Sequence, residues 1–381
     1  MGVGTLQAGN PSMGTVSRAP QTTAATPGTQ GVPFARLSRK GQIQGPTLAG
    51  QLYGGLWTPI LKPVGGYLRG LEFFVVASGG NLTAASFSAD APYNTIQNMF
   101  FRDPFGQPII QSSGYGLYLI NLYSGQVGAL GFGNNPATNP SFVAPSAANG
   151  TFTFHLNIPL ELDSSGYCSL PDMNASSQPQ MQVQLNPNIV VNPTSTGTTP
   201  PTLQLSLDEP FWMAPVDNPQ AAPADVGSSH QWSEVRAAAG VGANQFQRIQ
   251  LPRVGTYIST LILVLRDATG ARIDLWPTTD LSLWVDGVPV LFESFAERQD
   301  RMWAQFGVTR PVGVIVYTFR DSIQTLVSNG DTYDLILPTT PATLLEVAGT
   351  FGNITAGPAS ITATVGELFP LGGIPYTHLG S

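Results

Sequence analysis

The stretch "FFRDPFGQPII", residues 100–110, places an Arg-Asp pair and a glycine between two runs of large apolar residues. A related stretch, "LRDATGARIDL" at residues 265–275, repeats the arginine, the aspartate and the glycine, each 164 positions later. Aspartate favours the first position of a type I turn, and glycine favours the later position where φ becomes positive. Such a turn commonly joins two antiparallel strands. Both stretches therefore predict a strand, a tight turn and a second strand.

The similarity extends beyond the two turns, because residues 95–121 align with residues 259–285. Three apolar pairs in the flanks also lie 164 positions apart: Ile109 with Ile273, Leu117 with Leu281, and Leu119 with Leu283. Each copy occupies a comparable place in its own series of predicted strands. We interpret the copies as a duplicated unit, which indicates two similar β domains in one chain.

Alternation of apolar and polar residues predicts the strands. "FTFHLNIPLEL", residues 152–162, has its apolar residues on one face and its polar residues on the other. Pro159 lacks an N–H, so it indicates a sheet edge or a bulge. Further strands are predicted at "LEFFVVA", "NMFF", "MQVQLNP" and "TLQLSLDE" in the first half, and at "TYISTLILVLRD", "DLSLWVDGVPVLF", "VGVIVYTF", "TYDLILP" and "ITATVGEL" in the second.

One helix is predicted, near residues 294–306. Ser294 stands three residues before Glu297, which is a capping-box pattern. Three apolar residues of this helix share one face: Phe295, Met302 and Phe306. The helix is therefore expected to cover an end or a flank of the second set of strands. A ligand pocket at Met302 and Trp303 is the alternative interpretation.

Composition supports a large all-β protein. The 381 residues are 42% hydrophobic, include 42 glycines and 33 prolines, and are only 10% charged, which favours a turn-rich fold with a neutral surface. Composition changes at residues 1–48 and again at the proline-rich stretch "APVDNPQAAPADVGSSH", residues 214–230. We therefore expect two consecutive eight-stranded jelly rolls with a few short helices. The expected organisation is a flexible basic N-terminal arm (1–48), a first jelly roll (49–215), a linker (216–229) and a second jelly roll (230–381).

Charge is unevenly distributed. No acidic residue precedes Glu72, although the net charge of the whole chain is −7. The basic residues of this acid-free segment are Arg18, Arg36, Arg39, Lys40, Lys62 and Arg69. Such an arm could contact an anionic surface, either lipid headgroups or nucleic acid. The alternative is an arm whose charges are simply solvated.

The sequence gives no sign of export or of membrane insertion. Cys168 is the only cysteine, so no disulfide can form within the chain. The N-terminal residues lack the pattern of a signal peptide, and the longest apolar runs fall well short of the roughly 20 residues that cross a bilayer. We expect a soluble protein made in the cytosol.

Candidates for chemistry are weak, and no catalytic, cofactor-binding or metal-binding residue is predicted. The three histidines, His155, His230 and His378, lack the spacing of a metal site, and Cys168 has no nucleophile motif. The glycines at Gly114 and Gly240 are interpreted as turn residues, because no Lys-Ser/Thr follows to complete a phosphate loop. The acidic pairs Asp208–Glu209 and Asp331/Asp334 could serve a glycosidase, but solvated loop acids are the simpler interpretation.

Four stretches together resemble a known family. "RGLEFFVVASGGNLT", "NTIQNMFFRDPFGQPIIQSSGYGLYLINLYSG", "TFTFHLNIPLEL" and "PQMQVQLNP" occur in this order within residues 66–215. They resemble the first jelly roll of the double jelly-roll major capsid proteins of tectivirus-type bacteriophages. The second half agrees with that family in architecture only.

The resemblance implies a structural role. It implies homotrimers that form pseudo-hexagonal tiles of an icosahedral shell over an internal membrane, with neighbouring trimers and minor capsid and vertex proteins as partners. The protein would be made in the host cytoplasm and reside in the virion. The basic residues Arg18, Arg36, Arg39 and Lys40 would then face the internal membrane or an adjoining tile. No specific nucleic-acid binding is expected.

Two other functions stay open at this point. A carbohydrate-binding or receptor-binding spike or fibre module would use the same kind of sandwich, and surface aromatics at loop tips would favour it. The candidates for such aromatics are Trp212, Trp232 and Trp276. An enzyme, such as a glycoside hydrolase on a jelly roll, is the third hypothesis.

Overall fold

The computed structural model describes residues 34–81, 87–123, 146, 149–162, 166, 168–172, 178–187, 199–215, 222–223, 228–239, 244–252, 257–319, 337–339, 343–354 and 359–370. Residues 1–33, most of the predicted linker and most of the strand predicted at "TYDLILP" lie outside these residues. Everything below concerns the described part of the chain.

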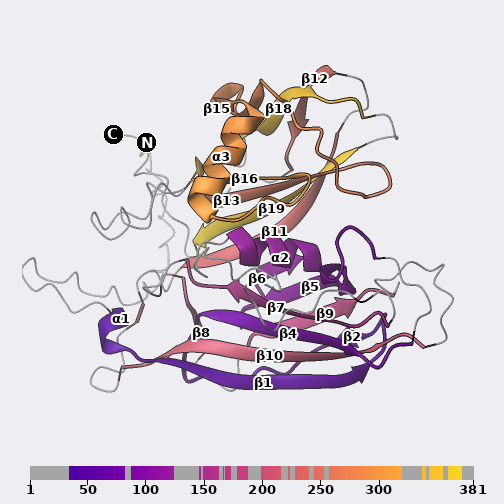
Figure 1. Ribbon diagram of the computed structural model, residues 1–381. Coiled ribbons are helices and arrows are strands. Elements are labelled where there is room, and N and C mark those ends of the chain that lie inside the picture. Colours follow the sequence, from indigo (N-terminus) through magenta and orange to yellow (C-terminus); the bar gives the residue numbers. More distant parts are fainter. Residues whose placement is uncertain are drawn as a thin grey trace, which may run out of the picture. The chain divides into compact units, whose positions relative to one another are not determined.

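The first half contains two sets of strands around one apolar core (Figure 1). A six-stranded sheet has the order β7-β4-β10-β3-β8, with β1 paired to β10. Its strands are β1 (Lys40–Gln51), β3 (Gly66–Leu68), β4 (Gly70–Ser78), β7 (Phe152–Pro159), β8 (Leu170–Asp172) and β10 (Thr202–Met213). The second set, ordered β6-β5-β9-β2, consists of β2 (Leu56–Trp57), β5 (Ile96–Arg102), β6 (Pro108–Ser112) and β9 (Gln180–Leu185).

The alternation predicted at residues 152–162 is confirmed over β7. Phe152, Phe154, Leu156 and Ile158 are buried, while the residues between them are half-buried. β7 is an edge strand of its sheet and ends at Pro159, as the missing N–H of proline requires. The period of two in the sequence thus defines which side of the strand faces the core.

The second half repeats the plan with two further sets of strands. One set, ordered β16-β13-β19-β11, has β17 (Leu337–Pro338) paired to β13. Its strands are β11 (Ser228–Ala238), β13 (Tyr257–Arg266), β16 (Val314–Thr318) and β19 (Ser360–Pro370). The other is a four-stranded sheet ordered β12-β18-β14-β15, made of β12 (Gln245–Gln250), β14 (Leu281–Val285), β15 (Val288–Glu293) and β18 (Leu345–Phe351).

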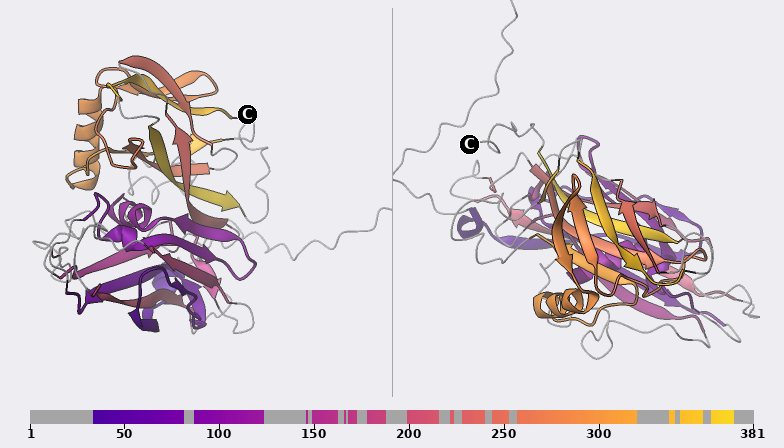
Figure 2. Two further views of the ribbon diagram at one scale, coloured as in Figure 1. Left: turned by 90° about the vertical axis from the view of Figure 1, so that its right-hand side faces the viewer. Right: turned by 90° about the horizontal axis from the view of Figure 1, so that it is seen from above.

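The predicted helix is confirmed as α3 (Phe295–Phe306). Ser294 and Glu297 form a reciprocal capping box at its start, and Gly307, with φ 64°, ends it. Met302 and Phe306 are buried, so the predicted apolar face packs inward. Figure 2 shows the helix lying along one flank of the second-half strands, as expected.

One sheet runs through both halves. β11 pairs in parallel with β6, with Trp232 opposite Ile110 and Ser233 opposite Gln111. This pairing joins the first-half strands β6-β5-β9-β2 to the second-half strands β16-β13-β19-β11, and with β17 they form a single nine-stranded sheet. The all-β fold with two sandwiches and short helices is confirmed, and the sandwiches share a sheet.

The predicted N-terminal arm extends too far along the chain. Residues 34–48 are not an arm, because α1 (Phe34–Leu37) and then β1 begin there. β1 pairs with β10 from Lys40 opposite Trp212 to Gln51 opposite Leu203. None of its side chains is fully buried, so the sequence shows no hydrophobic pattern. Backbone hydrogen bonds to β10 hold this strand in place. Because these bonds do not require apolar side chains, the composition of the strand resembles that of a flexible arm.

The alignment of residues 95–121 with residues 259–285 is also wrong in its last part. The strand and turn correspond, but residues 114–123 form α2 (Gly114–Tyr123), whereas residues 281–285 form β14. Nine of the ten residues of α2 are buried, so it has no polar face that would reveal a helical period. A short 3-10 helix, η1 (Tyr93–Thr95), precedes β5.

Candidate functional site

The residues that chemistry would use are dispersed or buried. His155 lies on β7 and stacks on Phe74 with ring centroids 4.2 Å apart, and burial lowers its pKa. His230 is buried on β11 beside Trp232. Cys168 is buried as well. His378, Gly240, Asp331 and Asp334 lie outside the described residues.

Two interpretations of sequence motifs are corrected. Gly114 is not a turn residue but the first residue of α2, where a Cβ would stand 1.9 Å from the carbonyl oxygen of Tyr93. The close approach of two backbones requires glycine there. Asp208 and Glu209 are not loop acids, because both lie on β10, and Glu209 is fully buried.

Glu209 occupies a core-facing position on a strand whose alternate residues are leucines. Its Oε1 accepts a hydrogen bond from the backbone N–H of Lys62 at 3.4 Å, and Asp172, also buried, accepts one from Val64 at 3.3 Å. Burial raises the pKa of Glu209 to about 7; the backbone N–H and the charge of Lys62 lower it, and the nearby carboxylates of Asp172 and Asp208 raise it. Neither Glu209 nor Asp172 forms an ion pair with a described residue, and burial raises the pKa of Asp172 as well.

The three tryptophans proposed as surface aromatics are all buried. Their exposed fractions are 3% for Trp212, 1% for Trp232 and 2% for Trp276. Each indole N–H donates to a fixed acceptor: Glu161 Oε2, the Pro159 carbonyl and the Gly313 carbonyl, respectively. These side chains belong to the core. The three positions therefore lack the surface aromatics that would have favoured a glycan-binding module.

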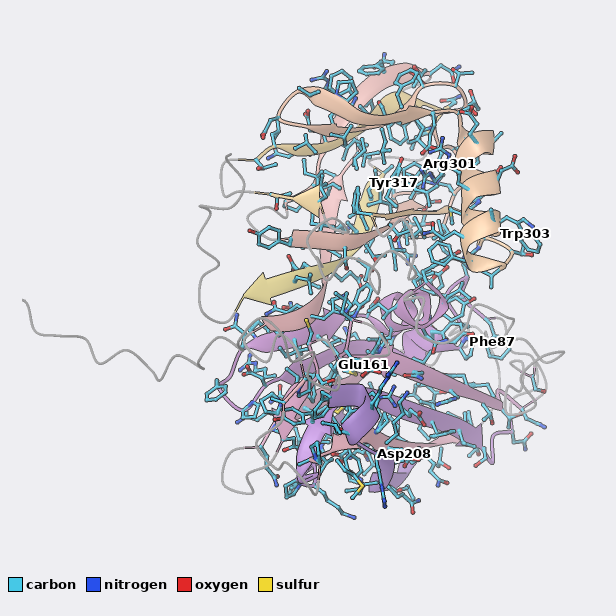
Figure 3. The ribbon with its side chains drawn as sticks, turned by 90° about the vertical axis from the view of Figure 1, so that its left-hand side faces the viewer. Phe87, Glu161, Asp208, Arg301, Trp303 and Tyr317 are labelled. Carbon is cyan, nitrogen blue, oxygen red and sulfur yellow. The ribbon has the colours of Figure 1, made fainter. Side chains whose placement is uncertain are left out.

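The helix α3 borders a shallow cavity of about 280 Å³. Met302 lines it but is 2% exposed, as predicted for a core residue. Trp303 is 59% exposed and projects outward from the helix (Figure 3). Among the described residues, no three metal-ligating side chains come together, and no helix there has the length and hydrophobicity to span a membrane.

The duplicated turn has the same hydrogen bonds in both copies. In the first copy, Gly106 N–H donates to the Asp103 carbonyl at 3.0 Å, and Asp103 Oδ1 accepts from the N–H groups of Phe105 and Gln107 at 2.9 and 2.7 Å. In the second, Gly270 N–H donates to the Asp267 carbonyl at 3.1 Å, and Asp267 Oδ1 accepts from Thr269 and Ala271 at 2.9 and 3.0 Å. The glycines have φ of 86° and 84°. The turn predicted from the sequence is confirmed twice.

The second copy of the turn contacts the first half of the chain through two arginines. Arg266 Nη1 donates to Asp90 Oδ2 at 2.7 Å and to the Gly270 carbonyl at 2.9 Å. Arg272 Nε lies 3.0 Å from Asp90 Oδ1. Both guanidinium groups also lie over the ring of Tyr115, at 5.4 and 4.8 Å from its centroid. We call this group of four residues the arginine junction.

A glutamate of the second half caps a helix of the first. Glu234, on β11, accepts hydrogen bonds through Oε2 from the backbone N–H of Ser113 at 2.8 Å and from its hydroxyl at 2.7 Å. The Ser113 Oγ in turn accepts from the N–H of Gly116, which places it as the N-cap of α2. A negative charge at a helix N-terminus is stabilising. A Cβ at Gly116 would lie 2.1 Å from Ser112 Oγ and 2.6 Å from Glu234 Oε2, so a side chain there would displace these capping groups.

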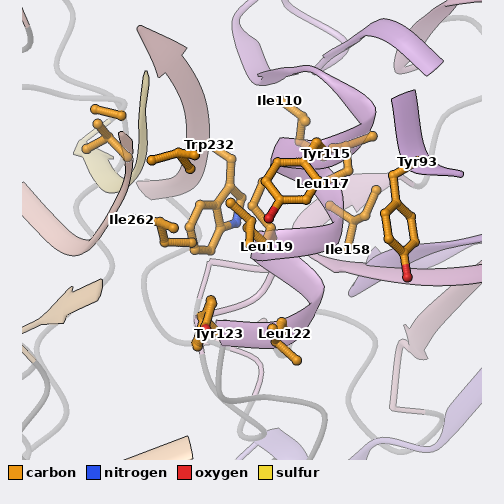
Figure 4. Close-up of a cluster of buried hydrophobic side chains, with 14 of the residues drawn as sticks. Tyr93, Ile110, Tyr115, Leu117, Leu119, Leu122, Tyr123, Ile158, Trp232 and Ile262 are labelled. Carbon is orange, nitrogen blue, oxygen red and sulfur yellow. The ribbon is translucent and has the colours of Figure 1, made fainter. Parts of the chain in front are cut away.

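Trp232 forms the apolar centre between the halves. Its indole lies between Ile262 of β13 and Leu119 of α2 (Figure 4), and all three residues belong to one buried cluster. Opposite Trp232 on β19 stands Gly366, where a Cβ would lie 2.7 Å from the indole ring. The two halves therefore share a continuous core as well as a sheet.

A small aromatic cluster fixes the start of the described chain. Phe34 of α1 packs edge-on against Tyr67 and Trp212, with ring centroids 5.5 and 6.0 Å apart. Arg69 lies over the Trp212 ring and pairs with Glu161, whose pKa is raised by burial. Phe34, the first described residue, is therefore anchored to the first sandwich.

The sequence patterns had no means of revealing these contacts between halves. Asp90 and Arg266 are separated by 176 residues, and Glu234 and Ser113 by 121. Their positions follow from the β6–β11 pairing, which no local pattern encodes. The one available signal is that Arg266 belongs to the duplicated turn.

Two sandwiches of this order, joined in one chain, define a double jelly-roll protein. Among solved structures, the chain is similar to the STIV MCP, with a TM-score of 0.61 and 15% identity over 90% of this chain and 99% of that chain. It is similar to a chain of Sulfolobus Turreted Icosahedral Virus, with a TM-score of 0.61 and 12% identity over 87% of this chain and 91% of that chain. A chain of the PBCV-1 virus capsid gives a TM-score of 0.58 and 13% identity over 89% and 97%.

These similarities establish a common fold across nearly the whole chain. No family model matches the sequence, and no curated protein matches it. The likeness therefore lies in the arrangement of strands, with very few residues in common.

Proposed function

We propose that the protein is a structural major capsid protein that forms homotrimers, and that these trimers tile an icosahedral virion shell. The observation that carries the proposal is the pair of sandwiches built on one shared sheet, at a length that covers 99% of the STIV MCP. Chains from two viruses share this fold, and for one of them the solved structure is a virus capsid. The low share of charged residues, 10%, also suits a protein with neighbours on most sides.

The duplicated sandwich explains how a trimer would tile. Three chains around a threefold axis present six similar sandwiches, so the outline is close to sixfold and each edge resembles the next. The same proposal divides the chain into a first jelly roll that begins at Phe34 and ends near residue 215, a linker that ends before Ser228 rather than at residue 229, and a second jelly roll that begins with β11 at Ser228. Minor capsid and vertex proteins would complete the shell.

We further propose that the N-terminal segment faces an internal membrane. The support is the absence of acidic residues before Glu72 and the exposure of Arg36 and Arg39 beside the anchored α1. Lys40 differs from these two, because its ammonium lies 4.8 Å from the Trp212 ring centroid. Arg18 lies outside the described residues.

Light scattering coupled to size exclusion, followed by negative-stain imaging, tests the trimer. A single chain has a mass of 40.3 kDa, so the trimer should have a mass of roughly 121 kDa and a hexagonal outline. A protein that remains monomeric at all concentrations and binds glycans would overturn the proposal. The spike or fibre alternative has no support from the three tryptophans, because each is buried.

A further inference from the structure

The two copies of the turn share a backbone but differ in what their arginines contact. In the second copy, the Arg266 side chain is 14% exposed and lies between Asp90 and the Gly270 carbonyl. In the first copy, Arg102 is exposed and forms no ion pair or side-chain hydrogen bond with any described residue. The arginine of the second copy is therefore bonded within the chain, whereas the arginine of the first copy has no such partner among the described residues.

The tip of the free turn is also apolar. Phe105 is 83% exposed, whereas Thr269, at the equivalent position of the second copy, bonds its hydroxyl to Asp267 Oδ1 at 2.7 Å. Burying a phenylalanine side chain removes a large apolar surface from water and so stabilises an association. An exposed phenylalanine beside an unpaired arginine forms a surface with both an apolar anchor and a charge.

The described side chains on the sheet face beside Arg102 offer its guanidinium no acidic partner. The neighbouring side chains on this face are Phe100, Gln180 and Gln182, and none is acidic. Arg102 stands opposite Gln180 in the β5–β9 pairing, and Phe100 stands opposite Gln182. This neutral face leaves the guanidinium available to a carboxylate from outside.

We propose that the Arg102–Gly106 segment docks on the second half of a neighbouring copy of this chain, as the Arg266–Gly270 segment docks on the first half of its own. The inference rests on the proposed trimer. In a ring of six sandwiches from three chains, each half meets the other kind of half on both sides. One of these contacts lies within the chain and contains the arginine junction. The other lies between chains, where Arg102 pairs with a carboxylate and Phe105 is covered.

The experiment compares matched substitutions at the two tips. Phe105→Asp should weaken the trimer by at least 10-fold in dissociation constant, because it places a charge where an aromatic side chain is buried. Thr269→Asp is the control at the equivalent position and should leave the trimer intact. Arg102→Glu should also weaken the trimer, whereas Arg266→Ala should lower the thermal midpoint of the chain without changing the trimer mass. Light scattering across a dilution series measures the first effect, and thermal unfolding the second.

The outcomes separate this inference from the proposed function. A wild-type chain that is monomeric overturns both. A wild-type trimer that survives Phe105→Asp and Arg102→Glu overturns the inference alone. As a second measurement, hydroxyl-radical footprinting should show Phe105 protected in the wild-type trimer relative to diluted monomer, and equal oxidation in the two states would overturn the inference even if a variant failed to fold.

Discussion

Glu209 is a carboxylic acid placed where the strand pattern calls for a leucine. Its folded-state pKa of about 7 lies above the ordinary 4.5, so the folded chain keeps this proton to a higher pH than the unfolded chain does. The free energy of unfolding should therefore decrease as pH rises from about 4.5 to about 7 and level off above that range. The difference between the two pKa values corresponds to roughly 3 kcal/mol.

Glu209→Gln should remove this pH dependence. The amide cannot ionise, so the variant should be more stable than the wild type at pH 8, by up to about 3 kcal/mol, and closer to it at pH 4. Urea unfolding at several pH values measures the effect. Asp300→Asn, at an exposed position on α3, is the control and should leave the slope unchanged. Equal slopes for wild type and Glu209→Gln would contradict the assignment.

The two turn glycines provide a matched pair at the same scale. A Cβ at Gly106 or Gly270 would meet no atom within 4 Å, so only the positive φ opposes a side chain there. Gly106→Ala and Gly270→Ala should each lower the free energy of unfolding by roughly 1 kcal/mol, and by similar amounts. Chemical denaturation of both variants tests this. Unequal losses would mean that one turn is strained by its surroundings.

Sequence patterns predicted these turns well, because an Asp and a Gly at fixed spacing encode a local hydrogen-bond arrangement. They failed to predict the burial of Glu209, because two adjacent acidic residues at the end of an alternating strand suggested a solvated loop. The difference is physical: a turn is determined by its own residues, whereas the burial of a side chain depends on segments such as Lys62–Val64 that pack on it from far along the chain.

At the scale of elements, α2 depends on a residue outside its own half. Its N-cap, Ser113, donates its N–H and its hydroxyl to the carboxylate of Glu234 on β11. The helix, the strand pairing β6–β11 and the Trp232 core are therefore coupled. An element of the first sandwich should respond to a change in the second.

Glu234→Ala should destabilise the chain by about 1–3 kcal/mol, because it leaves the Ser113 N–H and hydroxyl without their acceptor. Hydrogen exchange should show faster opening of the first turn of α2. Glu234→Gln keeps an acceptor oxygen and should therefore lose less stability than Glu234→Ala. If the amide hydrogens of α2 exchange at the wild-type rate in both variants, the Glu234 cap does not stabilise α2.

The same scale shows where sequence patterns were insufficient. β7 and α3 were predicted because each has a clear apolar face, whereas β13, which is buried at nine of its ten positions, was predicted from its β-branched and aromatic residues. β1 was missed because its side chains are not fully buried, and α2 because nearly all of its side chains are. A periodic pattern of apolar and polar residues is visible in the sequence only where one face of an element is exposed to solvent and the other is buried.

For the whole molecule, the proposed membrane contact depends on the charge of the N-terminal segment. The triple variant Arg18→Gln/Arg36→Gln/Arg39→Gln should bind vesicles containing phosphatidylglycerol roughly 100-fold more weakly, since each charge near an anionic surface contributes about 1 kcal/mol. Flotation of the trimer with such vesicles measures this. Arg301→Gln, an exposed arginine on α3, is the control. Unchanged flotation of the triple variant would contradict the membrane contact.

The parallel pairing of β6 with β11 also bears on how the chain is made. While a ribosome has released only the first half, the backbone groups of β6 that later bond to β11 have no partner from the second half. An unpaired strand edge is prone to join other chains. The first sandwich expressed alone should therefore tend to aggregate, and adding the β11 strand as a separate peptide should suppress that tendency. The shared sheet would thus favour making both sandwiches as one polypeptide.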